Sequence, residues 1–242
     1  MLFVEYYILG PKKMVDNEYY YKKLSALRLK RCYEIAPPRI QQYLEAEIQF
    51  VLDNIKSTDV VLELGCGYGR VLARLAMKAK SVYGIDTSED SLLHAHEFLA
   101  DFSNFELHKM DAASLNFKNQ TFDVVIAIQN GISTFKVDPQ KLIQESIRVT
   151  KTGGKVLFSS YSEKVWESRL DWFIKQSKEG LIGEIDSEKT GEGVIVCKDG
   201  FKATTYTVED FSDITSGMKV KAIIDEVDQS SIFCVIHVNR KN

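Results

Sequence analysis

The stretch VVLELGCGYGR, residues 60–70, decides the fold. Its first half is branched and apolar and predicts a buried strand, and the glycines after it predict a tight turn where the backbone can approach a ligand. An apolar pattern from Val71 to Met77 predicts that a helix begins directly after the turn. A strand, a glycine-rich turn and a helix in this order are typical of the first unit of a ligand-binding α/β sheet.

The spacing of the glycines narrows the kind of ligand. A dinucleotide fingerprint, G-x-G-x-x-G, would need its third glycine at position 70, where the chain has Arg70. The Lys-Ser/Thr pair of a phosphate-binding P-loop is also absent from the stretch. The turn reads G-x-G-x-G instead and is preceded by the acid Glu63. An NAD-dependent oxidoreductase is therefore a disfavoured structural competitor.

Strands and helices alternate after this turn. The predicted strands are 60–64, 81–86, 105–109, 122–128 and 155–160, and the predicted helices between them are 71–77, 88–100 and 138–149, with a turn at 152–154. Strands that are apolar on both faces predict a parallel sheet covered by helices on both sides. Such a sheet binds its ligand beyond the carboxyl ends of the strands.

The two ends of the chain have different patterns. Residues 17–35 and 39–54 predict two helices separated by a Pro-Pro break, and we expect residues 1–55 to form a helical lid on a main domain at 56–242, effectively as one domain. The later part predicts a helix at 163–178, a small β-rich insertion at about 181–207 with a hairpin turn at 198–200, a helix at 208–216, and strands at 219–227 and 231–239. The short turn between the last two strands permits only antiparallel pairing.

Composition and charge exclude several classes. The chain has 242 residues, 45% of them hydrophobic, and a net charge of −3, which argues against a protein held on nucleic acid by overall charge. The sequence shows no signal peptide, no apolar run long enough to span a bilayer and no paired cysteines, and we expect a cytoplasmic protein without a membrane partner.

The tyrosine-rich basic N-terminus is open to three interpretations: an amphipathic lid, a flap over the cofactor, or a nucleic-acid contact surface.

The motif E-x-G-x-G-x-G at residues 63–69 resembles motif I of class I S-adenosylmethionine (SAM)-dependent methyltransferases. The resemblance covers about residues 58–160. It includes Asp86, which ends the second strand, Met110-Asp111-Ala112 after the third, the fourth-strand segment 122–130, and the turn and strand at 153–157. It implies a Rossmann-like, doubly wound, mostly parallel seven-stranded α/β sheet with an antiparallel C-terminal β-hairpin. It also implies an enzyme that uses SAM and releases S-adenosylhomocysteine (SAH).

The resemblance also implies a set of site residues. Glu63 is expected near the methionine ammonium, Asp86 on the ribose hydroxyls and Asp111 on the adenine amino group. The full cofactor set is Glu63, Gly65, Cys66, Gly67, Gly69, Asp86, Thr87, Asp111, Ala112 and Gln129. The substrate candidates are Tyr33, Arg39 and Asn130. No catalytic residue is named, because the sulfonium activates its own methyl group, and no metal is expected.

The acceptor is narrowed by motifs that the chain does not contain. The segment after the fourth strand, residues 129–132, is Gln-Asn-Gly-Ile and not the N/D-P-P-Y/F of methyltransferases acting on exocyclic amines of nucleic acids. A Pro-Cys dipeptide and a K-D-K-E arrangement are also absent. These absences favour a small-molecule acceptor. An RNA or protein methyltransferase and a non-catalytic SAM-binding regulatory protein remain as alternatives.

Overall fold

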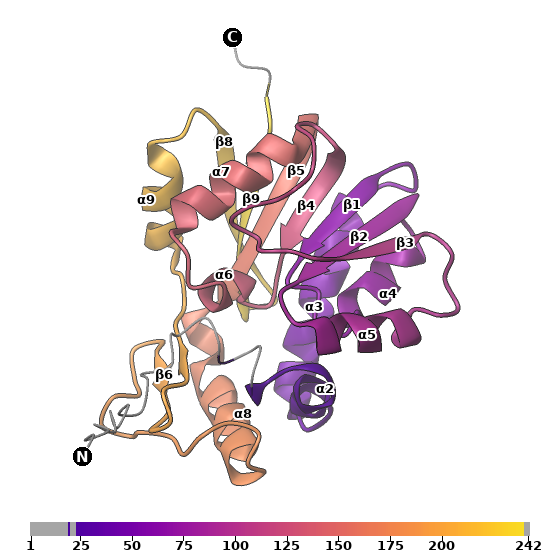
Figure 1. The fold of residues 1–242 in the computed structure, drawn as a ribbon. Helices are drawn as coiled ribbons and strands as arrows, with labels where there is room; N and C mark the ends of the chain where they lie inside the picture. Colours follow the sequence, from indigo (N-terminus) through magenta and orange to yellow (C-terminus); the bar gives the residue numbers. More distant parts are fainter. Residues whose placement is uncertain (1–18, 20–22, 240–242) are drawn as a thin grey trace, which may run out of the picture.

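The fold is built on one seven-stranded sheet, shown in Figure 1. The computed structural model describes residue 19 and residues 23–239. The strand order is β3-β2-β1-β4-β5-β9-β8. Its strands are β1 Val60–Leu64, β2 Ser81–Asp86, β3 Phe105–Lys109, β4 Phe122–Ala127, β5 Thr150–Tyr161, β8 Lys221–Val227 and β9 Ser231–His237. The predicted class, a mostly parallel α/β sheet, is confirmed.

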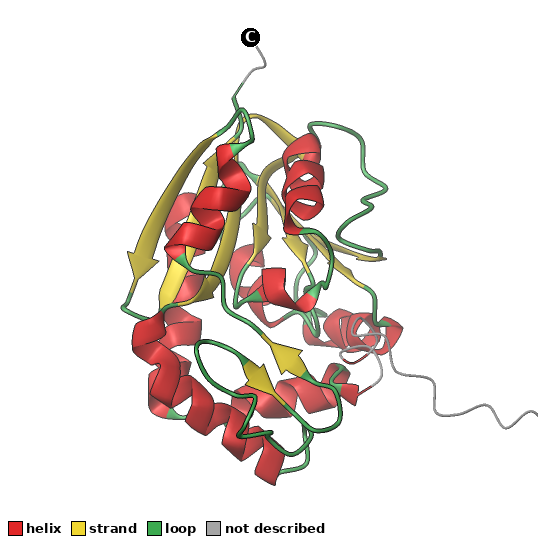
Figure 2. Ribbon diagram, turned by 90° about the vertical axis from the view of Figure 1, so that its left-hand side faces the viewer, coloured by secondary structure: helices red, strands yellow, loops and turns green. Residues whose placement is uncertain are grey.

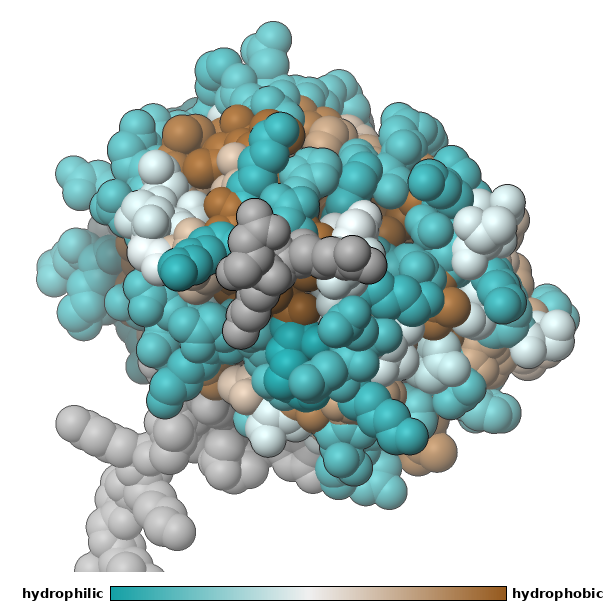
Figure 3. Space-filling view, turned by 90° about the horizontal axis from the view of Figure 1, so that it is seen from above, coloured by the Kyte–Doolittle hydropathy of each residue, from teal (hydrophilic) through white to brown (hydrophobic). Residues whose placement is uncertain are grey.

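The direction of each strand follows from the length of its connection. Strands β1 to β5 run parallel, with helices in the β1–β2, β2–β3 and β4–β5 connections and a loop between β3 and β4, whereas β9 runs antiparallel to both β5 and β8. The β8–β9 connection is the short turn 228–230, which confirms the predicted antiparallel hairpin. Figure 3 views the molecule from above relative to Figure 1, and hydrophilic side chains prevail around the rim of this face.

Helices cover both faces of the sheet, as Figure 2 shows. Helices α3 and α4 pack with β1, β2 and β4 on one face, and α7 and α9 pack on the other. The helices are α2 Ala26–Glu34, α3 Pro38–Asn54, α4 Arg70–Ala76, α5 Glu89–Phe98, α6 Gly131–Thr134, α7 Pro139–Val149, α8 Trp166–Lys178 and α9 Val208–Ser216, with a 3-10 turn η1 at Glu163–Val165. Within the described residues, every helix is too short or too polar to cross a bilayer.

Local capping accounts for several helix starts. The Ser88 hydroxyl accepts the Ser91 N–H at 3.1 Å and caps α5, as predicted. Asp138 caps α7, with Pro139 in the first turn. Thr207 and Asp210 form a reciprocal capping box at α9.

The N-terminal helices differ from the prediction. The single helix expected over 17–35 is interrupted at Ser25, which is extended, so α2 begins only at Ala26; residues 17, 18 and 20–22 lie outside the described part. Helix α3 buries Ile48 and Val51 against the sheet and therefore belongs to its covering layer. Within the described residues of the expected lid, α2 is the helix that lies over the glycine-rich turn.

One further local prediction was wrong, and one short helix was not predicted. Residues 152–154 do not form a turn before a strand, because β5 is continuous from Thr150 and absorbs these residues as an irregularity opposite β4. The positive φ of Gly153, 86°, allows this local distortion. The short helix α6, just after β4, was not predicted.

The insertion lies beside α8, below the main sheet in Figure 2. It contains the antiparallel strands β6 Ile195–Val196 and β7 Lys202–Ala203, which flank the predicted turn 198–200. Arg169 of α8 is fully buried and donates to the carbonyls of Gly193 and Ala203 at 2.9 and 3.4 Å. The insertion is thus attached to α8 through its own backbone.

Candidate cofactor site

A cavity of about 430 Å³ lies at the carboxyl ends of β1 to β4. Strand β1 has β2 on one side and β4 on the other, so the cavity is at the point where the strand order reverses. Open α/β sheets bind ligands at this switch point, and the volume is within the usual range for small-molecule sites. Among the predicted residues that line the cavity are Tyr33, Glu63, Gly65, Cys66, Gly67, Asp86, Thr87, Asp111, Ala112 and Gln129.

The glycine-rich turn is joined to the end of β2 by Asp86. The Asp86 carboxylate accepts the Gly67 N–H at 2.9 Å through one oxygen and the Ser88 N–H at 2.8 Å through the other. Gly65 and Gly67 have φ values of 70° and 54°, a conformation that strongly favours glycine. Burial raises the pKa of Asp86, while these backbone donors oppose the rise.

Glu63 is a buried carboxylate at the end of β1. It is 5% exposed, and within the described residues its Oε2 has no hydrogen-bond partner. Burial raises the pKa of Glu63 well above its ordinary value, and the nearby positive charge of Arg70 opposes the rise. A buried carboxylate oxygen without a partner is costly, and a cationic ligand group in the cavity would supply one.

Arg70 is a site residue that the sequence analysis used only to exclude a dinucleotide motif. Its guanidinium lies 4.4 Å from the centre of the Tyr33 ring, and its Nη2 donates to Gln129 Oε1. Arg70 lines the cavity together with both residues. The signal for it in the sequence was its position directly after the glycine-rich turn. The direction of its side chain depends on α2 and on the segment after β4.

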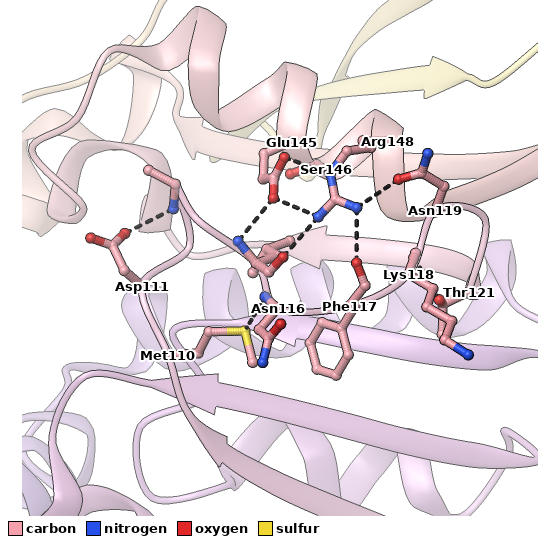
Figure 4. Close-up of polar contacts among 12 residues, drawn as sticks. Met110, Asp111, Asn116, Phe117, Lys118, Asn119, Thr121, Glu145, Ser146 and Arg148 are labelled. Atoms are coloured by element: carbon pink, nitrogen blue, oxygen red, sulfur yellow. Dashed lines mark hydrogen bonds and ion pairs between the residues drawn. The ribbon is translucent and has the colours of Figure 1, made fainter.

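The loop from β3 to β4 carries Asp111 and is held by α7, as Figure 4 shows. Arg148 donates to the carbonyls of Leu115 and Phe117, each at 2.8 Å, and Glu145 accepts the Leu115 N–H at 2.9 Å. Arg148 also binds Glu145 directly at 2.6 Å. The Asp111 carboxylate accepts the Ala113 N–H at 2.8 Å. The loop that carries Asp111 is thus fixed by Glu145 and Arg148 of α7, neither of which lines the cavity.

Helix α2 covers the glycine-rich turn. A Cβ added to Gly67 would lie 3.0 Å from Leu29 Cδ2, so α2 sits directly against the turn. The Ala26 N–H donates to the Ser91 hydroxyl at 3.1 Å on α5, and Trp172 Nε1 on α8 donates to the Cys32 carbonyl at 2.8 Å. The helix is therefore anchored at both ends, and it places Leu29 and Tyr33 in the cavity wall.

Three predicted site residues lie elsewhere. Gly69 faces α5, because a Cβ there would be 3.4 Å from the Ala95 Cβ of that helix. Arg39 donates to the Asp228 carboxylate and carbonyl, both at 2.7 Å, which corrects its assignment to the substrate. Asn130 donates to the Thr204 carbonyl at 2.9 Å and accepts the Ser160 hydroxyl at 2.8 Å, so its side chain links chain segments and does not line the cavity.

Glu47 of α3 is a further buried acid that the sequence analysis did not identify as functional. It is 0% exposed, and its carboxylate accepts the Gln129 N–H at 2.6 Å. Burial raises the pKa of Glu47 to about 7. No sequence signal indicated this contact, because Glu47 falls on the apolar face of a helix far from Gln129 along the chain.

Comparison with protein families finds a match over the central part of the chain. Residues 61–154 match a family model described as a methyltransferase domain. The chain is 33% identical over 104 residues to a phosphatidylethanolamine N-methyltransferase of Cereibacter sphaeroides, covering 42% of this chain and 50% of that protein. It is 40% identical over 73 residues to the "Probable ribosomal RNA small subunit methyltransferase A" of Methanococcus maripaludis strain C5, covering 30% and 28%. The chain thus spans about half the length, or less, of these curated relatives.

Solved structures share the fold. The PH0226 protein of Pyrococcus horikoshii is similar with a TM-score of 0.63 and 24% identity, covering 92% of this chain and 99% of that one. The N-methyltransferase NodS of Bradyrhizobium japonicum, crystallised with SAH, is similar with a TM-score of 0.61 and 12% identity, covering 93% and 99%.

The domain match and the fold together define the class. Residues 61–154 of the chain carry a methyltransferase domain, and the fold is the one seen in solved SAM-dependent methyltransferases. The resemblance noted in the sequence is confirmed.

Proposed function

We propose that this chain transfers a methyl group from SAM to a small-molecule acceptor. The observation that carries the proposal is that two groups of opposite charge line the same cavity: the Glu63 carboxylate, with a buried oxygen lacking a partner among the described residues, and the Arg70 guanidinium. A methionine head group presents an ammonium and a carboxylate. The two side chains match these groups in charge.

We assign the rest of the cavity by the same argument. Glu63 would bind the ammonium and Arg70 the carboxylate, while Asp86 would accept hydrogen bonds from the ribose hydroxyls. Asp111 and Ala112 would lie beside the adenine, on the loop held by α7. Asp86 already accepts two backbone N–H groups, and a carboxylate has lone pairs for further donors.

When bound, the cofactor supplies an electrophilic methyl group on a sulfonium. The residues of this chain would bind and orient it, and α2 packs against the glycine-rich turn at Gly67. The acceptor must approach in line with the bond that breaks, at roughly 3–3.5 Å. We expect it to enter beside Tyr33 and the segment after β4, where Thr134 and Phe135 line the cavity.

A small-molecule acceptor is supported by the names of several relatives. They include a demethylmenaquinone methyltransferase of Clavibacter sepedonicus, 33% identical over 102 residues and covering 42% of this chain and 41% of that protein. RNA is a second candidate, favoured by the match to the ribosomal RNA methyltransferase. The net charge of −3 and the residues at 129–132 argue against it.

Calorimetry with SAM, SAH and NAD tests the cofactor assignment. We expect SAM and SAH to bind and NAD not to bind. A metabolite extract incubated with SAM then tests the reaction, with SAH formation as the readout. SAH formed only in the presence of RNA, together with steeply salt-dependent RNA binding, would favour the second candidate. Full SAM binding without SAH from any acceptor pool would instead indicate a regulatory protein.

A further inference from the structure

The backbone just after β4 has an unusual conformation. Gln129 and Asn130 are consecutive non-glycine residues with positive φ, 57° and 62°. L-amino acids rarely adopt this conformation, and it persists only where the surrounding structure imposes it. Gln129 lines the cofactor cavity, so the strain is located at the site.

Glu47, on helix α3, holds the backbone of Gln129. Its Oε2 accepts the Gln129 N–H at 2.6 Å and the Ser159 hydroxyl at 2.8 Å, and its Oε1 accepts the Ser231 hydroxyl at 2.6 Å. The carboxylate thus joins α3 to β5, to β9 and to the backbone after β4. These are charge-assisted hydrogen bonds in a fully buried location, which makes them strong and directional.

The side chain of Gln129 connects this fixed backbone to Arg70 in the cavity wall. Gln129 Oε1 accepts from Arg70, whose guanidinium lies over the Tyr33 ring. Asn130 is held separately, by the Thr204 carbonyl and the Ser160 hydroxyl. Gln129 and Asn130 are therefore held by different partners. Of the two, Gln129 is the residue that contacts Arg70, and Glu47 is the charged group that holds it.

We propose that Glu47 is a positioning residue of the cofactor site. Its carboxylate fixes the backbone of Gln129, and Gln129 in turn fixes the orientation of Arg70 toward the bound methionine carboxylate. This inference rests on the proposed SAM site.

A purely structural role fits the observations less well. Burial raises the pKa of Glu47 to about 7, so keeping the carboxylate ionised inside the protein lowers stability. An apolar side chain of similar size would fill the same volume without that cost. Such a side chain would lack the carboxylate oxygen that accepts the Gln129 N–H at 2.6 Å, and only the Ser159 hydroxyl, at 2.8 Å, would remain as its acceptor.

The test compares three variants by SAH calorimetry and thermal unfolding. Glu47→Met removes the acceptor and keeps the volume, Glu47→Gln keeps an acceptor and removes the charge, and Asp53→Asn removes an exposed charge from the same helix as a control. We expect E47M to unfold cooperatively and to bind SAH at least tenfold more weakly than the wild type. We expect E47Q and D53N to bind within threefold of it, so the amide rescues the affinity.

The outcomes separate this inference from the proposed function. A wild-type protein that binds neither SAM nor SAH contradicts the SAM site itself. If the wild type binds and folded E47M binds equally well, only the role of Glu47 is overturned. If E47M does not fold, Ser159→Ala decides, because its hydroxyl bonds both Glu47 and the Gln129 N–H, at 2.8 Å each. We expect S159A to fold and to bind SAH at least threefold more weakly than the wild type. If folded S159A binds SAH as tightly as the wild type, the proposal is overturned.

Discussion

The Asp86 carboxylate accepts the Gly67 N–H at 2.9 Å, which joins the end of β2 to the glycine-rich turn after β1. Asp86 therefore has two roles: its carboxylate holds the turn in place, and it also lines the cavity. Its other oxygen accepts the Ser88 N–H and orders the start of α5. The geometry of the turn and the recognition of the ligand therefore depend on one side chain.

We predict that Asp86→Ala weakens SAM binding by about 1–3 kcal/mol, because charge-assisted hydrogen bonds to the ribose are lost. Calorimetry measures the change. Asp101→Ala, at an exposed position just beyond α5, is the control and should bind as the wild type does. Wild-type affinity in D86A would refute the ribose assignment.

Glu63→Gln should lower the affinity for SAM without lowering the stability of the ligand-free protein. The substitution removes a buried charge, so the ligand-free variant should be at least as stable as the wild type near pH 8. The ammonium loses its ionic partner, and we expect SAM to bind roughly tenfold or more weakly, about 1.4 kcal/mol. Thermal unfolding and calorimetry on the same samples check both. Unchanged affinity would show that the ammonium lies elsewhere.

Arg70→Met tests the carboxylate contact with a pair of ligands. SAH carries the amino-acid group and 5′-methylthioadenosine does not. We expect the variant to lose about 1.5–3 kcal/mol of SAH binding while 5′-methylthioadenosine binds as before. Arg74→Met is the matched control on the same helix, since Arg74 pairs with Glu45 at the surface. An equal loss for both ligands would mean that Arg70 acts on the whole cavity.

Glu47 should make stability depend on pH. Burial raises its pKa from 4.5 to about 7 in the folded protein. A carboxyl with a raised pKa contributes stability that is fully present below its unfolded value and is lost as the pH rises through the folded value. The free energy of unfolding should therefore fall between about pH 4.5 and 7, by up to about 3 kcal/mol from this group.

Denaturant unfolding of the wild type and E47Q at several pH values in this window measures the effect. Tyr43 and Tyr161 are the titratable side chains that face Glu47, and their pKa values are raised by burial, so both stay neutral throughout. E47Q should show a smaller fall than the wild type. Equal pH dependence in the two proteins would contradict the assignment to Glu47.

Much of the fold could be predicted because its signals are local. Apolar runs, glycine spacing and helix caps act within a few residues, and they placed β1, β2, β3 and α9 at their observed bounds. The residues that line the cavity at strand ends, such as Glu63, Asp86 and Asp111, were also found, because parallel strands bring their carboxyl ends to one edge. The bulge in β5 escaped prediction, because it depends on its pairing with β4.

The sequence by itself determined the class of domain, the order of its elements and the acids at the strand ends. The tertiary structure decided which polar side chains face the cavity. Arg39 is turned away by Asp228, 189 positions along the chain, and Arg70 is turned inward by Tyr33 and Gln129. The physical reason is that a long polar side chain takes its direction from hydrogen-bond partners, and these partners come from distant segments that only folding brings together.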